Sequence, residues 1–365
     1  QHAEAATQAV ESSGPPQLTI LFTTDAYNQN QVLEAVRKLV GDSRLVGFCG
    51  GGIITQDGVF PQGVGVCTMA GKELAAVTAL QRGLSKNPRE AGEKAGEALL
   101  ASGLKKGTVI VLPDGFQSNL SEMLRGLYHT MGPAFTYVGG GAGDNLKFFK
   151  TYQFTEQGID SDALAVALLD GVPVISGLGH GWQPMGEPLV ITKTKHKTVE
   201  EIDGVPPFQA YLKRLGHIEE GQFAQVGMKH PLGFPDISGN YLIRDPLTVN
   251  GNQSIHFVTE IPRNAVGNIM DCSMEELIGT AAAIAKKVVS GMHHPVHFVL
   301  LFDCISRFLL MGARFNDEIR AIREVIGPDT PLLGALTFGE VGSYLDIPLL
   351  HNKTTVIAMG GDRIL

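Results

Sequence analysis

The sequence predicts an α/β protein with mixed β-sheets, helices on the outer faces and two packed modules. Three observations support this class. An apolar run that ends in aspartate occurs three times, each run is followed by a segment with helical apolar spacing, and each unit then enters a glycine-rich turn. The 45 glycines in 365 residues indicate many tight turns, and hence many strands.

Each repeated unit opens with a strand that reads as buried, because Val, Ile, Leu and Phe follow one another without alternation. Such runs are typical of strands covered on both faces, which requires helices around the sheet. The three strands cover residues 18–27, 108–116 and 296–306, and they end at Asp25, Asp114 and Asp303.

A helix is expected after each of these strands. Residues 28–41 and 119–132 have apolar positions at helical spacing and stop at glycine. The third helix, 315–330, has Asn316 as its expected N-cap and ends at Gly327. The order helix, strand, helix, strand, strand therefore repeats.

Longer helices are expected between the units. One covers 72–101, with a break near Pro88, and another covers 273–291. A fourth, degenerate copy of the unit is expected over 187–260, where the sequence reads as strands and one helix.

The glycine runs resemble nucleotide-binding loops but lack their context. A phosphate-binding loop opens a helix, since the phosphate sits on the helix N-terminus. Residues 139–143 and 50–52 are instead followed by segments that read as strands, and no Gly-Lys-Ser/Thr sequence occurs. We therefore expect these glycines to turn one strand into the next and to allow backbone to approach a ligand closely.

Composition excludes several classes of partner. A formal net charge of −8 disfavours binding to nucleic acid and to anionic lipid, and no apolar run reaches the roughly 18 residues that span a bilayer. Four cysteines without a CxxC pair predict a reducing, cytoplasmic location. The alternative is a disulfide between Cys49 and Cys67 across a hairpin. Whether Gln1 is the native start stays open.

The order of several motifs resembles the FIST (F-box and intracellular signal transduction) family. The resemblance covers nearly all of 18–360 and rests on an ordered set of motifs. In place of the family's Gly-Arg pair after the cysteine strand, this chain has Ser306-Arg307. The matching segments are GGGAGD (139–144), 180–193, 201–216, HPLGF (230–234), IRDPLTV (243–249), FDCISR (302–307) and 332–359.

The resemblance implies an N-terminal extension (1–17), an N-terminal module (18–197) and a C-terminal module (198–365). It also implies a sensory protein that binds a small ligand such as an amino acid and acts through a separate signalling protein. Some bacterial members of the family are haem-containing nitric oxide sensors that regulate histidine kinases, so haem is a possible cofactor of this chain.

Charged residues in the repeats are candidate ligand contacts. Asp25, Asp114 and Asp303 follow strand ends, where α/β folds bind ligands, so they could hold an ammonium group. Arg244 and Arg307 could pair with a carboxylate. The alternatives are turn and capping roles for the aspartates and structural ion pairs for the arginines.

The glycine turns supply further candidates for a pocket rim. Gly140 and Gly141 expose backbone, and Asp144, Asn145 and Glu340 place polar side chains beside these turns. Ordinary turn chemistry is the alternative explanation for Asp144 and Asn145, whereas glutamate is a poor turn former.

Cys304 and His180 are candidates of a different kind. Cys304 is either an accessible thiol, with His351 as a possible base, or a buried small apolar residue; the adjacent Asp303 opposes thiolate formation. His180 is a candidate haem ligand or a loop histidine packed on Trp182. The histidines within 293–297 lack metal-site spacing, so no metal site is expected.

Three functions follow from the sequence. The first is a small-molecule sensor, the second is a haem-binding gas sensor, and the third is an enzyme with a thiol or acidic site. The enzyme ranks last because the chain contains no nucleophile elbow, metal-ligand spacing or cofactor fingerprint.

Overall fold

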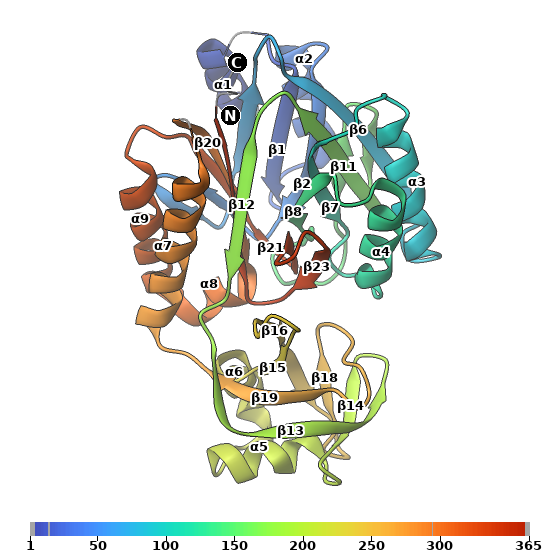
Figure 1. The fold of residues 1–365 in the computed structure, drawn as a ribbon, viewed down its shortest axis with the longest axis vertical. Coiled ribbons are helices and arrows are strands. Elements are labelled where there is room, and N and C mark those ends of the chain that lie inside the picture. Colours follow the sequence, from blue (N-terminus) through green and yellow to red (C-terminus); the bar gives the residue numbers. More distant parts are fainter. Residues whose placement is uncertain (1–3, 14, 294, 362–365) are drawn as a thin grey trace.

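The computed structural model describes residues 4–13, 15–293 and 295–361. Three mixed sheets form a main body, and a smaller subdomain lies below it, joined by two chain crossings (Figure 1). The inner faces of the three sheets pack around one shared apolar core, and helices cover their outer faces. The expected fold class, mixed α/β with outer helices, is confirmed.

Three repeated units build the main body. Each has a helix, a strand, a second helix, a second strand, a short hairpin and a closing strand, and the second and third units begin with one extra strand. The first unit contains α1 (Glu4–Ser13), β1 (Leu18–Thr24), α2 (Gln29–Val40), β2 (Arg44–Gly50), β3 (Ile53–Thr55), β4 (Gly58–Phe60) and β5 (Val64–Met69). The second contains β6 (Ala75–Arg82), α3 (Pro88–Leu100), β7 (Gly107–Pro113), α4 (Leu120–Met131), β8 (Phe135–Gly140), β9 (Gln153–Thr155), β10 (Gly158–Asp160) and β11 (Ala163–Asp170). The third contains β12 (Val174–Gly179), α7 (Met274–Gly291), β20 (Val296–Cys304), α8 (Ile305–Met311), α9 (Phe315–Ile326), β21 (Leu332–Thr337), β22 (Glu340–Ser343), β23 (Pro348–His351) and β24 (Thr355–Gly361).

The units exchange their hairpins in a cycle. In each sheet the first and second long strands of a unit are parallel, and the closing strand is antiparallel to the first. The hairpin of a unit leaves that sheet and extends a neighbouring one. The sheet orders are β10-β9-β2-β1-β5, β23-β22-β8-β7-β11-β6 and β12-β24-β20-β21-β3-β4.

The glycine runs lie where the ends of β2, β8 and β21 meet. Gly51 N donates to Leu336 O at 2.8 Å, and Gly141 N donates to Gly339 O at 2.8 Å. A Cβ on Gly141 would lie 2.3 Å from the Phe338 carbonyl oxygen, so only glycine allows this approach. A strand, β3, follows residues 50–52 directly, as expected, but residues 139–143 run into a loop over 144–152, so the strand expected there is confined to β9. Both glycine runs approach backbone of another unit closely.

The subdomain forms a separate antiparallel sheet, with order β16-β15-β19-β13-β14-β18-β17. The expected fourth copy of the unit over 187–260 is wrong, because this sheet contains no parallel pair among the described residues. Its elements are β13 (Gln183–Lys195), β14 (Thr198–Ile202), α5 (Pro207–Leu215), α6 (Phe223–Lys229), β15 (Leu232–Pro235), β16 (Tyr241–Arg244), β17 (Pro246–Val249), β18 (Ile255–Phe257) and β19 (Val266–Asp271).

Two sequence expectations about local structure need correction. Residues 75–82 form strand β6, because they pair with β11 along its whole length, and the expected helix over 72–101 is confined to α3. Arg314, not Asn316, occupies the N-cap of α9. The alternative of a Cys49–Cys67 disulfide is wrong, because both residues are free thiols on strands that flank β1 on opposite sides.

Both expected modules contribute to the main body. The segment 1–17 contains α1, whose Ala6 is buried against the first unit, while Gln1 lies outside the described residues. The sheets that contain β12 and β8 take strands from both sides of the expected boundary at residues 197 and 198, and that boundary stays a prediction. Within the described ranges, no helix combines the length and apolarity needed to cross a membrane.

Candidate functional site

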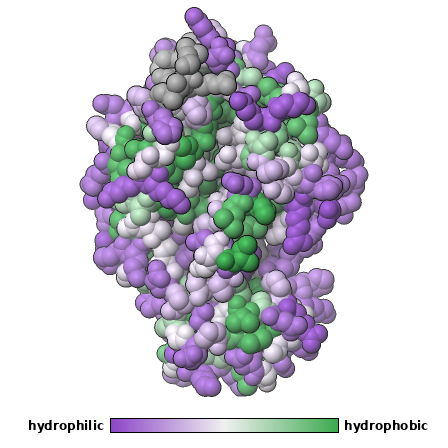
Figure 2. Space-filling model, in the orientation of Figure 1, coloured by the Kyte–Doolittle hydropathy of each residue, from purple (hydrophilic) through white to green (hydrophobic). Residues whose placement is uncertain are grey.

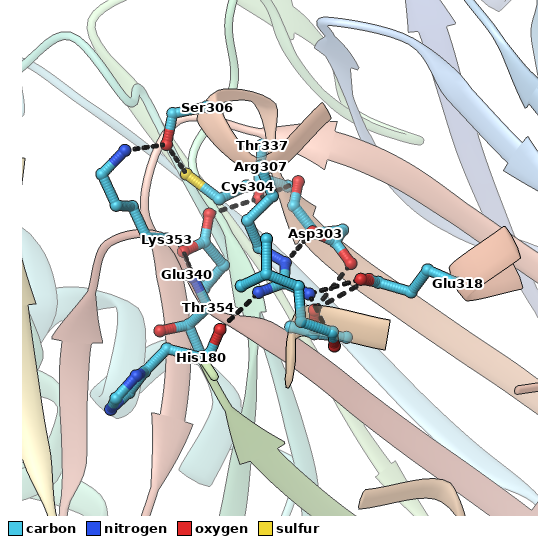
Figure 3. Close-up of polar contacts among 12 residues, drawn as sticks. His180, Asp303, Cys304, Ser306, Arg307, Glu318, Thr337, Glu340, Lys353 and Thr354 are labelled. Atoms are coloured by element: carbon cyan, nitrogen blue, oxygen red, sulfur yellow. Dashed lines mark hydrogen bonds and ion pairs between the residues drawn. The ribbon is translucent and has the colours of Figure 1, made fainter. Parts of the chain in front are cut away.

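A buried polar cluster lies at the carboxyl end of β20. Figure 3 shows the contacts among its residues. Arg307 and Asp303 at its centre have no exposed surface. The helix α8 begins directly after β20, so Arg307 folds back onto Asp303, with Nε 3.1 Å from Oδ1. Glu318 on α9 binds the other side of the guanidinium through Nη2.

The remaining donors and acceptors of this cluster are also satisfied internally. Arg307 Nη1 donates to the His180 carbonyl oxygen at 2.5 Å, and Thr355 Oγ1 donates to Asp303 Oδ2 at 2.7 Å. Burial alone would lower the pKa of Arg307, but the Glu318 and Asp303 carboxylates raise it above its ordinary value. These contacts favour the structural ion-pair interpretation of Asp303 and Arg307 over ligand binding.

A second chain of polar contacts crosses from the subdomain into the main body. Lys353 Nζ lies 3.0 Å from Asp245 Oδ1 and 3.3 Å from Ser306 Oγ, and the Ser306 hydroxyl lies 3.2 Å from Cys304 Sγ. Lys353 is fully buried, and its ammonium also lies 5.3 Å from the Trp182 ring centroid. The chain links Asp245 of the subdomain to Lys353, Ser306 and Cys304 of the main body.

Glu340 is the last member of this chain of contacts, inside the main body, because its side chain hydrogen-bonds Cys304. Its carboxylate accepts hydrogen bonds from Thr337 Oγ1 at 2.8 Å and from Thr354 N at 3.2 Å. Burial raises the pKa of Glu340 to about 8, although these hydrogen bonds oppose the rise. Glu340 therefore begins strand β22 with internal structural partners, and its expected place at a pocket rim stays a prediction.

The Cys304 thiol is buried, and burial raises its pKa far above the ordinary range. Its partner is Ser306, whereas His351 Nε2 lies 3.3 Å from the Gly342 carbonyl oxygen. A buried thiol with a raised pKa is a poor nucleophile. The arrangement favours a structural role for Cys304, and the His351 pairing is not formed.

His180 does not fit a haem ligand. Its Nδ1 accepts a hydrogen bond from Trp182 N at 2.9 Å, and the backbone of Tyr241 also hydrogen-bonds the ring. Burial, followed by the charge of Arg307, lowers the pKa of His180 to about 4, so the ring is neutral. Ligation of iron would require these backbone contacts to break.

The other two strand-end aspartates have different surroundings. Asp25 pairs with Lys147 near the surface. Asp114 is buried and accepts hydrogen bonds from Phe116 N at 3.0 Å, Gln117 Nε2 at 3.0 Å and Asp162 N at 3.2 Å. This is the turn chemistry that the alternative interpretation of Asp114 predicts. Asp25, Asp114 and Asp303 each bind different partners in these contacts.

The loop after β8 is organised by Asp144. Its buried carboxylate accepts hydrogen bonds from the backbone of Phe148 at 2.8 Å and Phe149 at 2.6 Å, while Asn145 is exposed with φ 56°. Gly140 packs so closely on Thr337 that a Cβ would lie 2.5 Å from Cγ2. Asp144, Gly140 and Gly141 therefore have structural contacts here.

Arg244 lies in a different place, beside a cleft of about 870 Å³ between α4 and the subdomain. Its Nη1 donates to Ile243 O at 2.9 Å and Leu350 O at 3.4 Å. Burial lowers the pKa of Arg244 to about 10, and the charge of Glu260, which also lines the cleft, opposes this. Within the described chain no carboxylate forms an ion pair with Arg244.

Sequence reasoning missed several of these residues, and only one carried a usable signal. Glu318 lies between Phe315 and Ile322 on the apolar stripe of α9, which marks it as a buried charge. Nothing local distinguishes the others, because their burial depends on contacts between distant segments. The missed residues are Asp245, Glu260, Ser306, Glu318, Lys353 and Thr355.

Two of the relatives that this chain matches are uncharacterised proteins. An uncharacterised Methanocaldococcus jannaschii protein is 26% identical over 194 residues, which cover 49% of this chain and 37% of that protein. An uncharacterised Mycobacterium tuberculosis protein is 25% identical over 389 residues, which cover 98% of this chain and 95% of that protein.

Among solved structures, a chorismatase matches with 8% identity and a TM-score of 0.34, over 96% of this chain and 94% of that one, which is too weak to support any argument. Residues 17–205 match the FIST N domain, and residues 207–343 match the FIST C domain. The chain belongs to the FIST family, whose domains are generally regarded as small-ligand sensors in signal transduction.

Proposed function

We propose that this chain is a sensory protein whose ligand, an amino acid or a similar small carboxylate, binds in the cleft between α4 and the subdomain. Arg244 is the observation that carries the proposal. Its guanidinium is desolvated, yet its described contacts are with carbonyl oxygens through Nη1 alone. A guanidinium has five N–H donors in a fork that matches a carboxylate, so the unused donors suit an anionic group.

Glu260 supplies the complementary charge. It lines the same cleft as Arg244, and the Asn119 amide lies 3.0 and 3.3 Å from its two carboxylate oxygens. An α-amino acid carries a carboxylate and an ammonium group on one carbon. Arg244 and Glu260 together offer one partner for each charge.

The rest of the cleft suits a small molecule with an apolar part. Leu124, Ile261 and Leu350 line its walls, and its volume lies within the usual range of ligand pockets, about 300–1,000 Å³. Figure 2 shows an apolar patch on this face near the β22–β23 hairpin, where Leu345 and Ile347 are exposed. Ile347 lies at the border of the cleft.

The sensor is proposed to pass its signal to a separate protein, such as a histidine kinase, in a reducing compartment such as the cytoplasm. Free cysteines support the compartment, since Cys49, Cys67, Cys272 and Cys304 are all unpaired as thiols. The partner is supported by the family's role in signal transduction alone.

A thermal-shift screen against the twenty amino acids, followed by calorimetric titration, tests the proposal. A ligand at a hundred times its Kd adds about 2.7 kcal/mol of stability, which raises the unfolding midpoint by several degrees. Arg244→Met should weaken binding at least about tenfold, since a charged hydrogen bond contributes about 1.5–3 kcal/mol.

Arg125→Met is the matched control, because Arg125 lines the same cleft but is largely exposed and pairs with Glu122. It should leave the affinity within about threefold. Equal affinity of the Arg244→Met and wild-type proteins would place the ligand elsewhere. A screen in which no amino acid raises the midpoint would reject this class of ligand.

A further inference from the structure

The cyclic exchange of hairpins builds one kind of interface twice. In the first copy, edge strand β6 faces β2 and the β9–β10 hairpin; in the second, edge strand β12 faces β8 and the β22–β23 hairpin. Strand β6 corresponds to β12, β2 to β8, and the β9–β10 hairpin to the β22–β23 hairpin. A group that occupies one interface therefore indicates what kind of group the other interface could bind.

The chain itself fills the first interface with a carboxylate. Glu156, in the turn between β9 and β10, accepts hydrogen bonds from Thr78 Oγ1 on β6 at 2.7 and 2.6 Å. It also accepts one from Leu45 N on β2 at 3.1 Å. Arg44 Nη1 lies 3.0 Å from the same carboxylate and neutralises it. Glu156 thus bridges the edge strand, the neighbouring sheet and a cation.

The second interface has no such bridge. Among the residues that the structure describes, no hydrogen bond joins β12 to β8 or to the β22–β23 hairpin. A groove of about 470 Å³ lies there instead, and Ser343 Oγ beside it is buried without a hydrogen-bond partner. Buried hydroxyls are nearly always paired, so an unpaired one at a groove points to a missing partner.

The groove is lined by the same residue types that bind Glu156 in the first interface, namely hydroxyl-bearing residues and a basic residue. Thr136, Ser176 and Ser343 are the hydroxyl-bearing residues along it, and Lys287 of α7 also lines it. Lys287 forms no ion pair with any residue in the described ranges. Asp346 also lines the groove, and it is exposed at the hairpin turn as Lys287 is exposed on α7, so solvent screens both charges.

We propose that this groove is a second binding site, and that it takes the carboxylate group of a small molecule. The carboxylate occupies the place that Glu156 has in the first interface. It accepts hydrogen bonds from the groove hydroxyls and pairs with Lys287. The groove volume lies within the range of ligand pockets, about 300–1,000 Å³.

This site is independent of the proposed amino-acid cleft. The groove and the cleft share no lining residue, and they lie on either side of the β22–β23 hairpin, with Ser343, Tyr344 and Asp346 at the groove and Ile347 at the cleft. A substitution that removes one site therefore leaves the other intact. A result that contradicts one proposal does not contradict the other.

Calorimetric titration with succinate as the probe, and with neutral succinamide as its matched compound, tests the site. Succinate should bind and succinamide should not. Lys287→Met and Ser343→Ala should each weaken succinate binding at least about fivefold. Arg244→Met should leave it unchanged.

Lys286→Met is the matched control, since Lys286 is the neighbouring exposed lysine of α7 and does not line the groove. Equal losses in the two lysine variants would mean that succinate responds to surface charge alone, and the proposal would fail. It would fail equally if succinate does not bind, or if succinamide binds as tightly.

Discussion

The Lys353 ammonium and the Asp245 carboxylate form a buried ion pair, 3.0 Å apart, that joins the main body to the subdomain. Lys353 precedes β24, and Asp245 lies between β16 and β17. Trp182, at the crossing from one part to the other, stacks near both Lys353 and Arg307. The subdomain is thus held to the main body by contacts at the buried polar cluster of β20 as well as by the two chain crossings.

Asp245→Asn should destabilise the protein by about 3–5 kcal/mol, because it leaves a fully buried ammonium without its counter-charge. Urea unfolding at pH 7 measures this loss. Glu200→Gln, which removes the partly exposed partner of the exposed Lys193, is the control and should change stability by less than about 1 kcal/mol. Similar losses in both variants would show that the buried pair has no special role.

Gly141→Ala should destabilise the protein by about 1–3 kcal/mol or more, because the new Cβ would lie 2.3 Å from the Phe338 carbonyl oxygen. Gly279→Ala on α7 has open space around its Cβ and should be neutral or stabilising by up to about 1 kcal/mol. Thermal unfolding compares the two. A Gly141→Ala protein as stable as wild type would contradict the close meeting of the three strand ends.

His351 should make the protein less stable in acid. Burial, followed by the charge of Arg244, lowers its pKa from 6.5 to about 3, so between these values the unfolded chain binds more protons than the folded one. The stability is present above pH 6.5 and is lost as the pH falls towards 3, by up to about 1.4 kcal/mol per pH unit.

Unfolding midpoints at pH 7, 6 and 5 test this, with His351→Gln and exposed His217→Gln compared with wild type. The first variant should lose less stability than wild type on acidification, and the second should follow wild type. Parallel curves for all three proteins would contradict the prediction.

Glu340 should act in the opposite direction on the alkaline side. Burial raises its pKa from 4.5 to about 8, so its contribution is present below pH 4.5 and is lost as the pH rises through 8. Between pH 6.5 and 8.5, where His351 stays neutral in the folded protein, the wild-type protein should lose stability as the pH rises. Glu340→Gln should make this loss smaller, whereas the variant of exposed Glu324, Glu324→Gln, should show the same loss as wild type. A wild-type protein with no decline over this range would contradict the raised pKa.

Much of the fold was predictable because its signals are local. The buried strands β1, β7 and β20 and the helices α2 and α4 follow from apolar runs, helical spacing and terminal glycines. Strand β6 was missed because its Ala-rich segment fits a helix as well as a strand, and pairing with β11 decides between them. The hairpin exchange joins segments far apart in sequence, so no local pattern reveals it.

The candidate site was less predictable than the fold. The sequence marks both Arg244 and Glu340 as candidate ligand contacts. It does not distinguish them, although Arg244 lies beside a cleft and Glu340 lies inside the core. Asp303 and Arg307 read as ligand contacts, although α8 turns Arg307 onto Asp303 and α9 adds Glu318. Their partners come from separate elements, and packing alone determines which charges are neutralised inside the protein.

The exchange of hairpins also has a consequence for synthesis of the protein. β3 emerges from the ribosome early, but its partner β21 lies in the third unit, near the other end of the described chain. At about 5–20 residues per second, the wait is on the order of tens of seconds. Meanwhile the nascent chain carries an apolar hairpin with an unpaired edge, which invites association with other chains. We therefore expect productive folding in the cell to depend on chaperones that hold this hairpin until the last unit arrives.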